Sequence, residues 1–211
     1  MTIKINYSKK TSSKPSTNVV LFTDEKFNIN NVKNKVSNQE YFYLNDLLKK
    51  RDLKKSLLVF EVSSKKKIIL ISIKKNLETS DVENLGAEFY NYINHENKGE
   101  FVINVESIKS EIEDFIGHFL HGVKLKSYVF NIYKSKKENK IFLINIIGKK
   151  NKLTLKNELR FKAIEEGTFF ARDLVSEPPN VLNPKEYTNR LLRLRKLGIK
   201  VTVYNEAQMK K

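Results

Sequence analysis

The chain has 211 residues, a formal net charge of +16, 40% hydrophobic residues and no cysteine. This length allows one large domain, or one domain with part of a second, and the apolar content is sufficient for a packed core. The lack of cysteine excludes disulfides, thiolate metal sites and cysteine nucleophiles, and the lack of a signal peptide or a membrane-length apolar run leads us to expect a cytoplasmic protein.

Alternating strands and helices are predicted for residues 1–150. Apolar runs that end at polar turn residues predict strands over 19–22, 57–62, 67–73, 100–105 and 141–147. The second and third of these are separated by a short polar turn, which predicts a hairpin. Apolar residues at steps of three and four predict helices over 80–94 and 108–123, the first with Ser80 and Glu83 at capping-box spacing.

This order of elements predicts an α/β domain over residues 1–150, with a mixed sheet flanked by helices. Residues 141–147 are nearly all apolar, which is typical of a central strand buried on both faces. The polar stretch Lys149–Lys152 predicts a linker at the end of this domain. We therefore place the first domain boundary there.

Residues 151–177 are assigned to an interdomain helix. Apolar side chains recur along 155–174, and Gly167 lies inside this pattern. Because glycine in a helix costs about 1 kcal/mol relative to alanine, Gly167 predicts a close packing partner. The prolines of Ser176–Pro179 end the helix, since proline is incompatible with a continuing helix and disfavours it in the preceding residue.

Residues 178–211 are predicted to be the first β-α elements of a second, truncated α/β domain. Asn183 and Pro184 open a helix as N-cap and first residue, and Gly198 ends it. Residues 199–204 alternate as a strand, and 205–209 begin another helix. The apolar side chains of this tail lack a core of their own, so we expect protease sensitivity or association; they are Leu191, Leu194, Leu197, Val201, Val203 and Met209.

The basic charge permits two interpretations. Lysines that neutralise phosphates release counterions, so a strongly basic chain can bind nucleic acid. Against this, the basic residues are scattered and only six of the 40 are arginine, the residue that base reading favours. Solubility is the preferred interpretation and a nucleic-acid-binding module is the alternative. A cluster at the end of one helix is interpreted as interacting with the helix dipole: Arg190, Arg193, Arg195 and Lys196.

Four residues form a candidate metal site. Steps of three and four place them on one face of the predicted helix, and carboxylate and imidazole suit zinc or manganese: Glu111, Asp114, His118 and His121. That face lies opposite the apolar stripe, which favours a charge pair in solvent over a metal site. His95 lies in a polar turn and is predicted to be exposed. Nucleophilic chemistry is not indicated, because no Gly-x-Ser-x-Gly motif surrounds the serines at 127, 135 and 176.

A family resemblance is carried by the run from Glu166 to Pro184, EGTFFARDLVSEPPNVLNP. It is similar, almost position by position, to leucyl (cytosol) aminopeptidases just ahead of their catalytic domain. The segments GIKV at 198–201 and NEAQMKK at 205–211 continue the likeness. Residues 122–134, GVKLKSYVFNIYK, resemble the family's signature near the end of its N-terminal domain. Before about residue 120 the resemblance rests on the order of elements.

The resemblance implies a macro-domain-like fold for residues 1–150. These enzymes remove N-terminal residues, often leucine, from peptides with two divalent ions (zinc, manganese or magnesium), and they assemble as hexamers. Some bacterial members also bind DNA. Their metal ligands and catalytic residues lie in the C-terminal domain, and no segment of this chain matches those motifs. We therefore assign no catalytic, metal or cofactor-binding residue here and expect the chain alone to be inactive.

The macro-like fold does not by itself imply ADP-ribose binding. The chain has seven glycines, and none of them fall into a Gly-rich loop that could cradle phosphates. Because function depends on the site rather than on the fold, ADP-ribose binding is not expected.

Overall fold

The computed structural model describes residues 2–8, 18–96, 99–135, 140–148 and 153–210. The chain divides into two compact units, Met1–Glu165 and Glu166–Lys211. The predicted linker Lys149–Lys152 lies outside the described residues. Among the described residues, no helix is both long and apolar enough to span a membrane.

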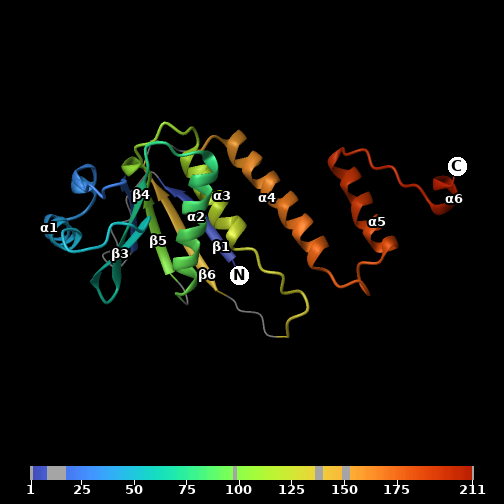
Figure 1. The fold of residues 1–211 in the computed structure, drawn as a ribbon, viewed down its shortest axis with the longest axis horizontal. Helices are drawn as coiled ribbons and strands as arrows, with labels where there is room; N and C mark the ends of the chain where they lie inside the picture. Colours follow the sequence, from blue (N-terminus) through green and yellow to red (C-terminus); the bar gives the residue numbers. More distant parts are fainter. Residues whose placement is uncertain (1, 9–17, 97–98, 136–139, 149–152, 211) are drawn as a thin grey trace. The chain divides into compact units, whose positions relative to one another are not determined.

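The first unit contains a six-stranded sheet with the order β1-β6-β5-β2-β4-β3 (Figure 1). Its strands are β1 (Thr2–Ser8), β2 (Asn18–Asp24), β3 (Leu57–Ser63), β4 (Lys66–Ile73), β5 (Gly99–Asn104) and β6 (Ile141–Ile147). Every neighbouring pair is parallel except β3 and β4. The predicted α/β class with a mixed sheet is therefore confirmed, as is the antiparallel β3-β4 hairpin.

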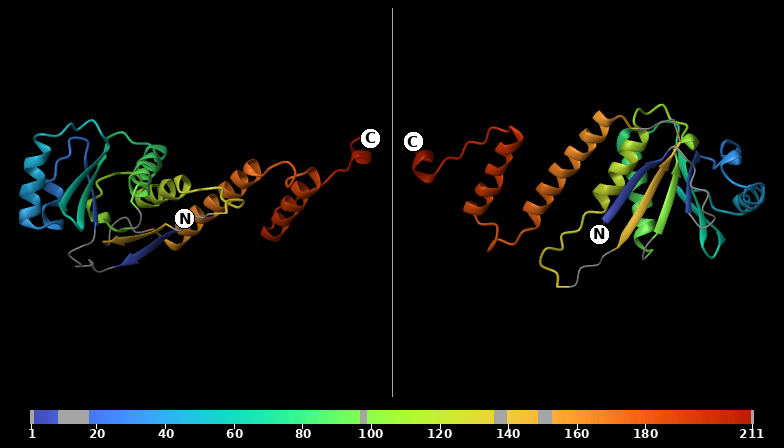
Figure 2. Two further views of the ribbon diagram at one scale, coloured as in Figure 1. Left: turned by 90° about the horizontal axis from the view of Figure 1, so that it is seen from below. Right: turned by 180° about the vertical axis from the view of Figure 1, so that it is seen from behind.

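Helices cover both faces of this sheet. They are η1 (Asn30–Lys35), α1 (Asn38–Leu48), α2 (Thr79–Asn94), η2 (Val105–Ser107), α3 (Phe115–Lys126) and the start of α4 (Leu155–Ser176). Alternate strand residues face different layers: Val20 and Ile69 belong to the core that includes α2 and α3, whereas Leu21 packs in the core beneath α1. Figure 2 shows α1 on one side of the sheet and α2 and α3 on the other. Both faces are thereby shielded, as a largely parallel sheet requires.

Two elements of the first unit are not predicted from the sequence. Strand β1 pairs with β6 at the edge of the sheet, so β6 is not the outermost parallel strand. Helix α1 fully buries only Leu44, and its apolar stripe is correspondingly weak. The prediction that β6 is buried on both faces is wrong in part, because Leu143 and Asn145 on its second face remain half exposed.

Helix boundaries also differ from the predictions. Helix α3 begins at Phe115 rather than at Ile108, because residues 108–114 form a loop that follows η2. The N-cap of α2 is Glu78, two residues before Ser80, and the backbone N–H of Glu78 donates to Asp81 Oδ2 over 2.9 Å. The buried apolar positions of α2 and α3 agree with the predicted stripes, but each helix begins at a different residue from the one predicted.

The second unit continues α4 into α5 (Pro184–Leu192), η3 (Arg193–Leu197) and α6 (Glu206–Met209). The predicted N-cap Asn183 accepts a hydrogen bond from the backbone of Glu186 over 3.0 Å, and Gly198 ends η3 at φ +81°. The predicted strand 199–204 does not form. An isolated strand leaves its backbone groups unpaired, and the described part of this unit has no second strand to pair with it.

Helices α2 and α3 approach each other through glycine. A Cβ atom added to Gly86 of α2 would overlap the Phe119 carbonyl of α3, and one added to Gly122 of α3 would overlap the Glu83 carbonyl of α2. The backbones therefore touch where side chains would separate them. For Gly167 of α4, by contrast, no described atom outside the local helix backbone lies within 4 Å of an added Cβ, so the described residues do not provide the predicted close partner.

Replacing Gly122 by alanine should destabilise the chain by about 2–3 kcal/mol, because the added methyl group forces two packed backbones apart. The matched control is Gly167→Ala, which should stabilise by about 0.5–1 kcal/mol because alanine is the better helix former and meets no obstacle. Urea unfolding followed by circular dichroism measures both. Equal midpoints for the two variants would contradict the glycine contact.

Candidate functional site

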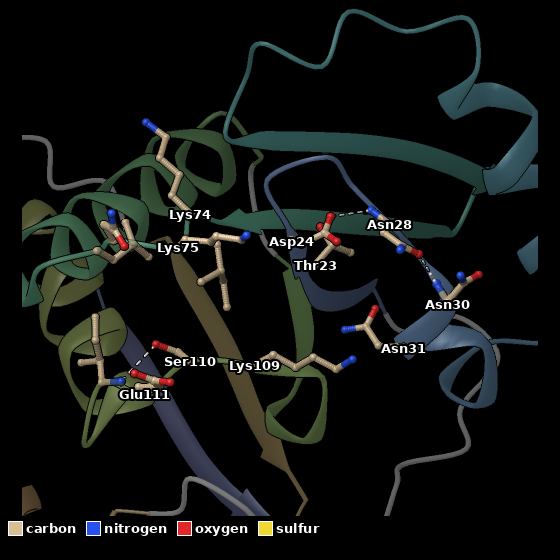
Figure 3. Close-up of a pocket in the computed structure, with 14 residues that line it drawn as sticks. Thr23, Asp24, Asn28, Asn30, Asn31, Lys74, Lys75, Lys109, Ser110 and Glu111 are labelled. Carbon is tan, nitrogen blue, oxygen red and sulfur yellow. Dashed lines mark hydrogen bonds between the residues drawn. The ribbon is translucent and has the colours of Figure 1, made fainter.

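A pocket of about 860 Å³ lies at the carboxyl edge of the sheet (Figure 3). It is lined by residues from the end of β2 and the loop after it, from the end of β4 and the loop after it, and from the loop after η2. After β2 the chain passes to the face covered by α1, whereas after β4 it passes to the face covered by α2. Connections that leave to opposite faces create a topological switch point, which is where open α/β sheets bind ligands.

Three lysines and two carboxylates line this pocket. Lys74, Lys75 and Lys109 are exposed, and none of them forms an ion pair or hydrogen bond with a described residue. Asp24 serves the loop after β2: its Oδ1 accepts hydrogen bonds from the backbone N–H groups of Lys26 (3.1 Å) and Asn28 (2.9 Å). The pocket thus carries uncommitted positive charge beside one carboxylate that shapes a turn.

The floor of the pocket is held by hydrogen bonds between β2 and η2. Ser107 Oγ accepts from the Phe22 N–H (2.9 Å) and donates to the Asn104 carbonyl (2.6 Å). Asn31 Nδ2 donates to the carbonyls of Phe22 (3.4 Å) and Ser107 (3.3 Å). Two buried atoms beside these groups, Asn31 Oδ1 and Thr23 Oγ1, have no hydrogen-bond partner among the described residues. Buried polar groups of this kind are uncommon and call for an explanation.

The pocket lining contains no histidine, and within the described residues no group of three or more His, Cys, Asp or Glu side chains could hold a metal ion. The sequence did not predict this pocket, because its lining comes from loops far apart in the chain, and its lysines come from two of them. A usable signal exists after β2 and β4, where polar residues directly follow an apolar strand.

The structure separates the four residues of the candidate metal site. Glu111 and Asp114 precede α3, and Asp114 adopts φ +53° at its N-cap. His118 Nδ1 lies 3.1 Å from Glu83 Oε1 on α2, whereas His121 Nδ1 lies 3.3 Å from Glu165 Oε1 on α4. The assumption of a single helical face is therefore wrong, because the helix starts later than the periodicity indicates.

The prediction that this face is solvent-exposed is also wrong. Helix α4 covers it, and the ring centroid of Phe161 lies 4.9 Å from that of His118 and 5.5 Å from that of His121. His121 is only 5% exposed. His95, by contrast, is exposed at the C-terminal cap of α2, as predicted.

Glu165 anchors the first half of α4. It is 6% exposed, and its carboxylate accepts a hydrogen bond from Lys124 Nζ over 2.8 Å in addition to facing His121. Burial, together with the nearby carboxylates of Glu158 and Glu165, raises the pKa of Tyr7 to about 12. The phenol of Tyr7 therefore remains neutral at physiological pH, and this cluster connects β1, α3 and α4.

In the second unit, Arg190 holds a turn. Its Nη1 donates to Glu177 Oε1 over 2.9 Å and its Nε donates to Glu186 Oε1 over 3.1 Å. The hydrogen bond to Glu186 raises the pKa of Arg190, and the same bond lowers the pKa of Glu186. Arg195 likewise donates to the Val201 carbonyl over 2.6 Å. These two arginines thus have specific hydrogen-bond partners in addition to their positions in the last turns of α5 and η3.

No family model matches the chain. Individual curated proteins do match it. The chain is 36% identical over 96 residues to a probable cytosol aminopeptidase of Dinoroseobacter shibae, and the matched region covers 46% of this chain and 20% of that protein. A probable cytosol aminopeptidase of Nitrobacter winogradskyi is 27% identical over 157 residues, or 69% of this chain and 30% of that protein. The matches thus span less than a third of these relatives.

Solved structures share the fold. A mutant of tomato leucine aminopeptidase has a TM-score of 0.70 at 16% identity and covers 99% of this chain and 46% of its own. The cytosol aminopeptidase from Coxiella burnetii has a TM-score of 0.62 at 14% identity, over 97% of this chain and 41% of its own. The chain is therefore homologous to cytosol aminopeptidases over part of its length and has the fold of the corresponding part of leucine aminopeptidase.

Replacing Glu165 by glutamine should lower the free energy of unfolding by about 1–3 kcal/mol, because His121 and Lys124 lose a buried charged acceptor. Glu113→Gln, which removes an exposed carboxylate shortly before α3, is the matched control and should change stability by less than about 0.5 kcal/mol. Thermal and urea unfolding measure both variants. A Glu165→Gln chain as stable as the control would refute the anchoring role.

Proposed function

We propose that this chain is the non-catalytic N-terminal part of a metal-dependent leucyl aminopeptidase, a hydrolase that removes N-terminal amino acids, preferentially leucine, from peptides. The supporting observation is the partial homology to probable cytosol aminopeptidases, at 36% identity over 96 residues for one of them. The shared fold over 99% of the chain agrees with it. The resemblance of residues 166–184 to the segment ahead of the catalytic domain suggests where that domain would follow.

In this proposal the chemistry lies outside the chain. Two divalent ions, manganese, zinc or magnesium, polarise the peptide carbonyl and supply the attacking hydroxide in a two-metal hydrolysis. The catalytic part would provide their ligands. The name cytosol aminopeptidase, carried by the relatives, supports a cytoplasmic location.

The proposed role of this part is structural. Its sheet is a rigid platform covered on both faces, and the Arg190 fork holds the turn at Glu177 that leads into α5. Such a platform can limit access to an active site and help position subunits, and a hexamer is the assembly we propose for the complete enzyme. The peptide substrate would contact the catalytic part.

Hydrolysis of leucine p-nitroanilide in the presence of manganese tests this proposal. Residues 1–211 should show no hydrolysis above the metal-only blank, since the proposal assigns the metal ligands to the catalytic part. The same chain extended through the coding sequence that follows should be active, and a chelator should abolish that activity. Robust hydrolysis by residues 1–211, or an inactive and correctly folded extended chain, would overturn the proposal.

A basic module that binds nucleic acid is the second candidate, favoured by the net charge of +16. Fluorescence anisotropy with a short DNA duplex at two salt concentrations distinguishes the candidates. Binding through phosphates should weaken by orders of magnitude, roughly 10³-fold or more for six contacts, between about 50 and 200 mM salt. Absence of salt-dependent binding by residues 1–211 would leave only the peptidase proposal.

A further inference from the structure

We infer that the pocket at the carboxyl edge of the sheet binds a small phosphate-bearing molecule of nucleotide size. This inference is independent of the proposed function, because every residue that lines the pocket belongs to the first unit and none takes part in peptide hydrolysis. It is tested by measuring ligand binding to the chain itself, without any assay of peptide hydrolysis.

The first support is the charge. Three ammonium groups, those of Lys74, Lys75 and Lys109, belong to the lining and are not neutralised by any described partner. In Figure 3 the side chains of Lys75 and Lys109 extend toward the part of the pocket formed by Asp24 and Asn31. The three lysines outnumber the two lining carboxylates, and one of these, Asp24, accepts hydrogen bonds from its own loop. An anion in the pocket is therefore attracted more than it is repelled.

The second support is size and chemistry. A volume of about 860 Å³ falls within the range that holds small molecules and cofactors. Asn28, Asn30 and Asn76 line the pocket with amide groups, which can both donate and accept hydrogen bonds. Three apolar side chains, Ile73, Leu77 and Ile112, also belong to the lining and can contact a sugar or base. A bare inorganic ion would leave most of this surface unused.

The mode of binding differs from a glycine-rich phosphate loop. No glycine lines the pocket, so close backbone cradling of a phosphate is not available. Lysine binds phosphate as a point charge on a flexible stem. We therefore expect recognition that depends on the charge of the ligand and weakens with salt, rather than tight geometric selection.

Titration of the isotopically labelled 211-residue chain with adenosine diphosphate, followed by amide NMR shifts and calorimetry, tests the inference. Shifts should concentrate at 23–31, 73–77 and 109–112. The double variant Lys75→Gln/Lys109→Gln should bind about tenfold more weakly or worse. Lys54→Gln/Lys156→Gln is the matched control, since it removes the same charge from exposed positions outside the pocket, and its affinity should stay within about twofold.

Two further probes define the ligand class. Adenosine, which lacks phosphate, and inorganic phosphate, which lacks the nucleoside, should each bind the same residues at least about tenfold more weakly than adenosine diphosphate. Absence of shifts at millimolar nucleotide would overturn the inference, and so would equal losses in the two double variants. A DNA duplex that competes for the same residues with higher affinity would identify a nucleic-acid surface instead and likewise overturn it. Unchanged thermal unfolding of both double variants shows that the fold is retained.

Discussion

The backbone contact between α2 and α3 is the constraint on which the rest of the first unit depends. Gly86 and Gly122 let the two helices touch, so that they cover one face of the sheet as a single layer. A third glycine, Gly117, makes room on α3 for Phe161 of α4. Because α3 is then packed against the sheet, α2 and α4, its two histidines are enclosed between neighbours and pair with Glu83 and Glu165. What resembles a polar helix face in the sequence is an interface in the fold.

The pocket forms because the chain passes to opposite faces of the sheet after β2 and after β4. Residues after β2 cover the α1 face, and residues after β4 lead into α2, so the loops diverge and leave a hollow at the edge. The net charge of +16 is spread over the whole chain, and solubility remains an adequate explanation for most of it. At this one edge, however, lysines without a described ion-pair partner coincide with a concave surface that is also lined by amide side chains. That coincidence distinguishes a binding site from a charged surface.

The run that carries the family resemblance contains residues with evident structural roles. Glu177 is engaged by Arg190, and the prolines after it begin a turn in which the Val181 and Leu182 N–H groups donate to the Pro178 carbonyl. Asn183 then caps α5. These contacts explain why this order of residues makes a stable helix–turn–helix connection.

Local patterns in the sequence determined the strands β2 to β6, the β3-β4 hairpin, the cap at Asn183 and the turn at Gly198, because each depends on residues only a few positions apart. Only the tertiary structure decided the rest. Strand β1 exists through its pairing with β6 more than 130 residues away, and the equally strand-like residues 199–204 find no such partner. The pocket was not predicted, and Glu111, which lines it, was assigned to a different candidate site; the floor depends on the contact between Phe22 and Ser107, 85 residues apart. Burial and pairing across such separations are properties of the folded chain, and no short window of sequence contains them.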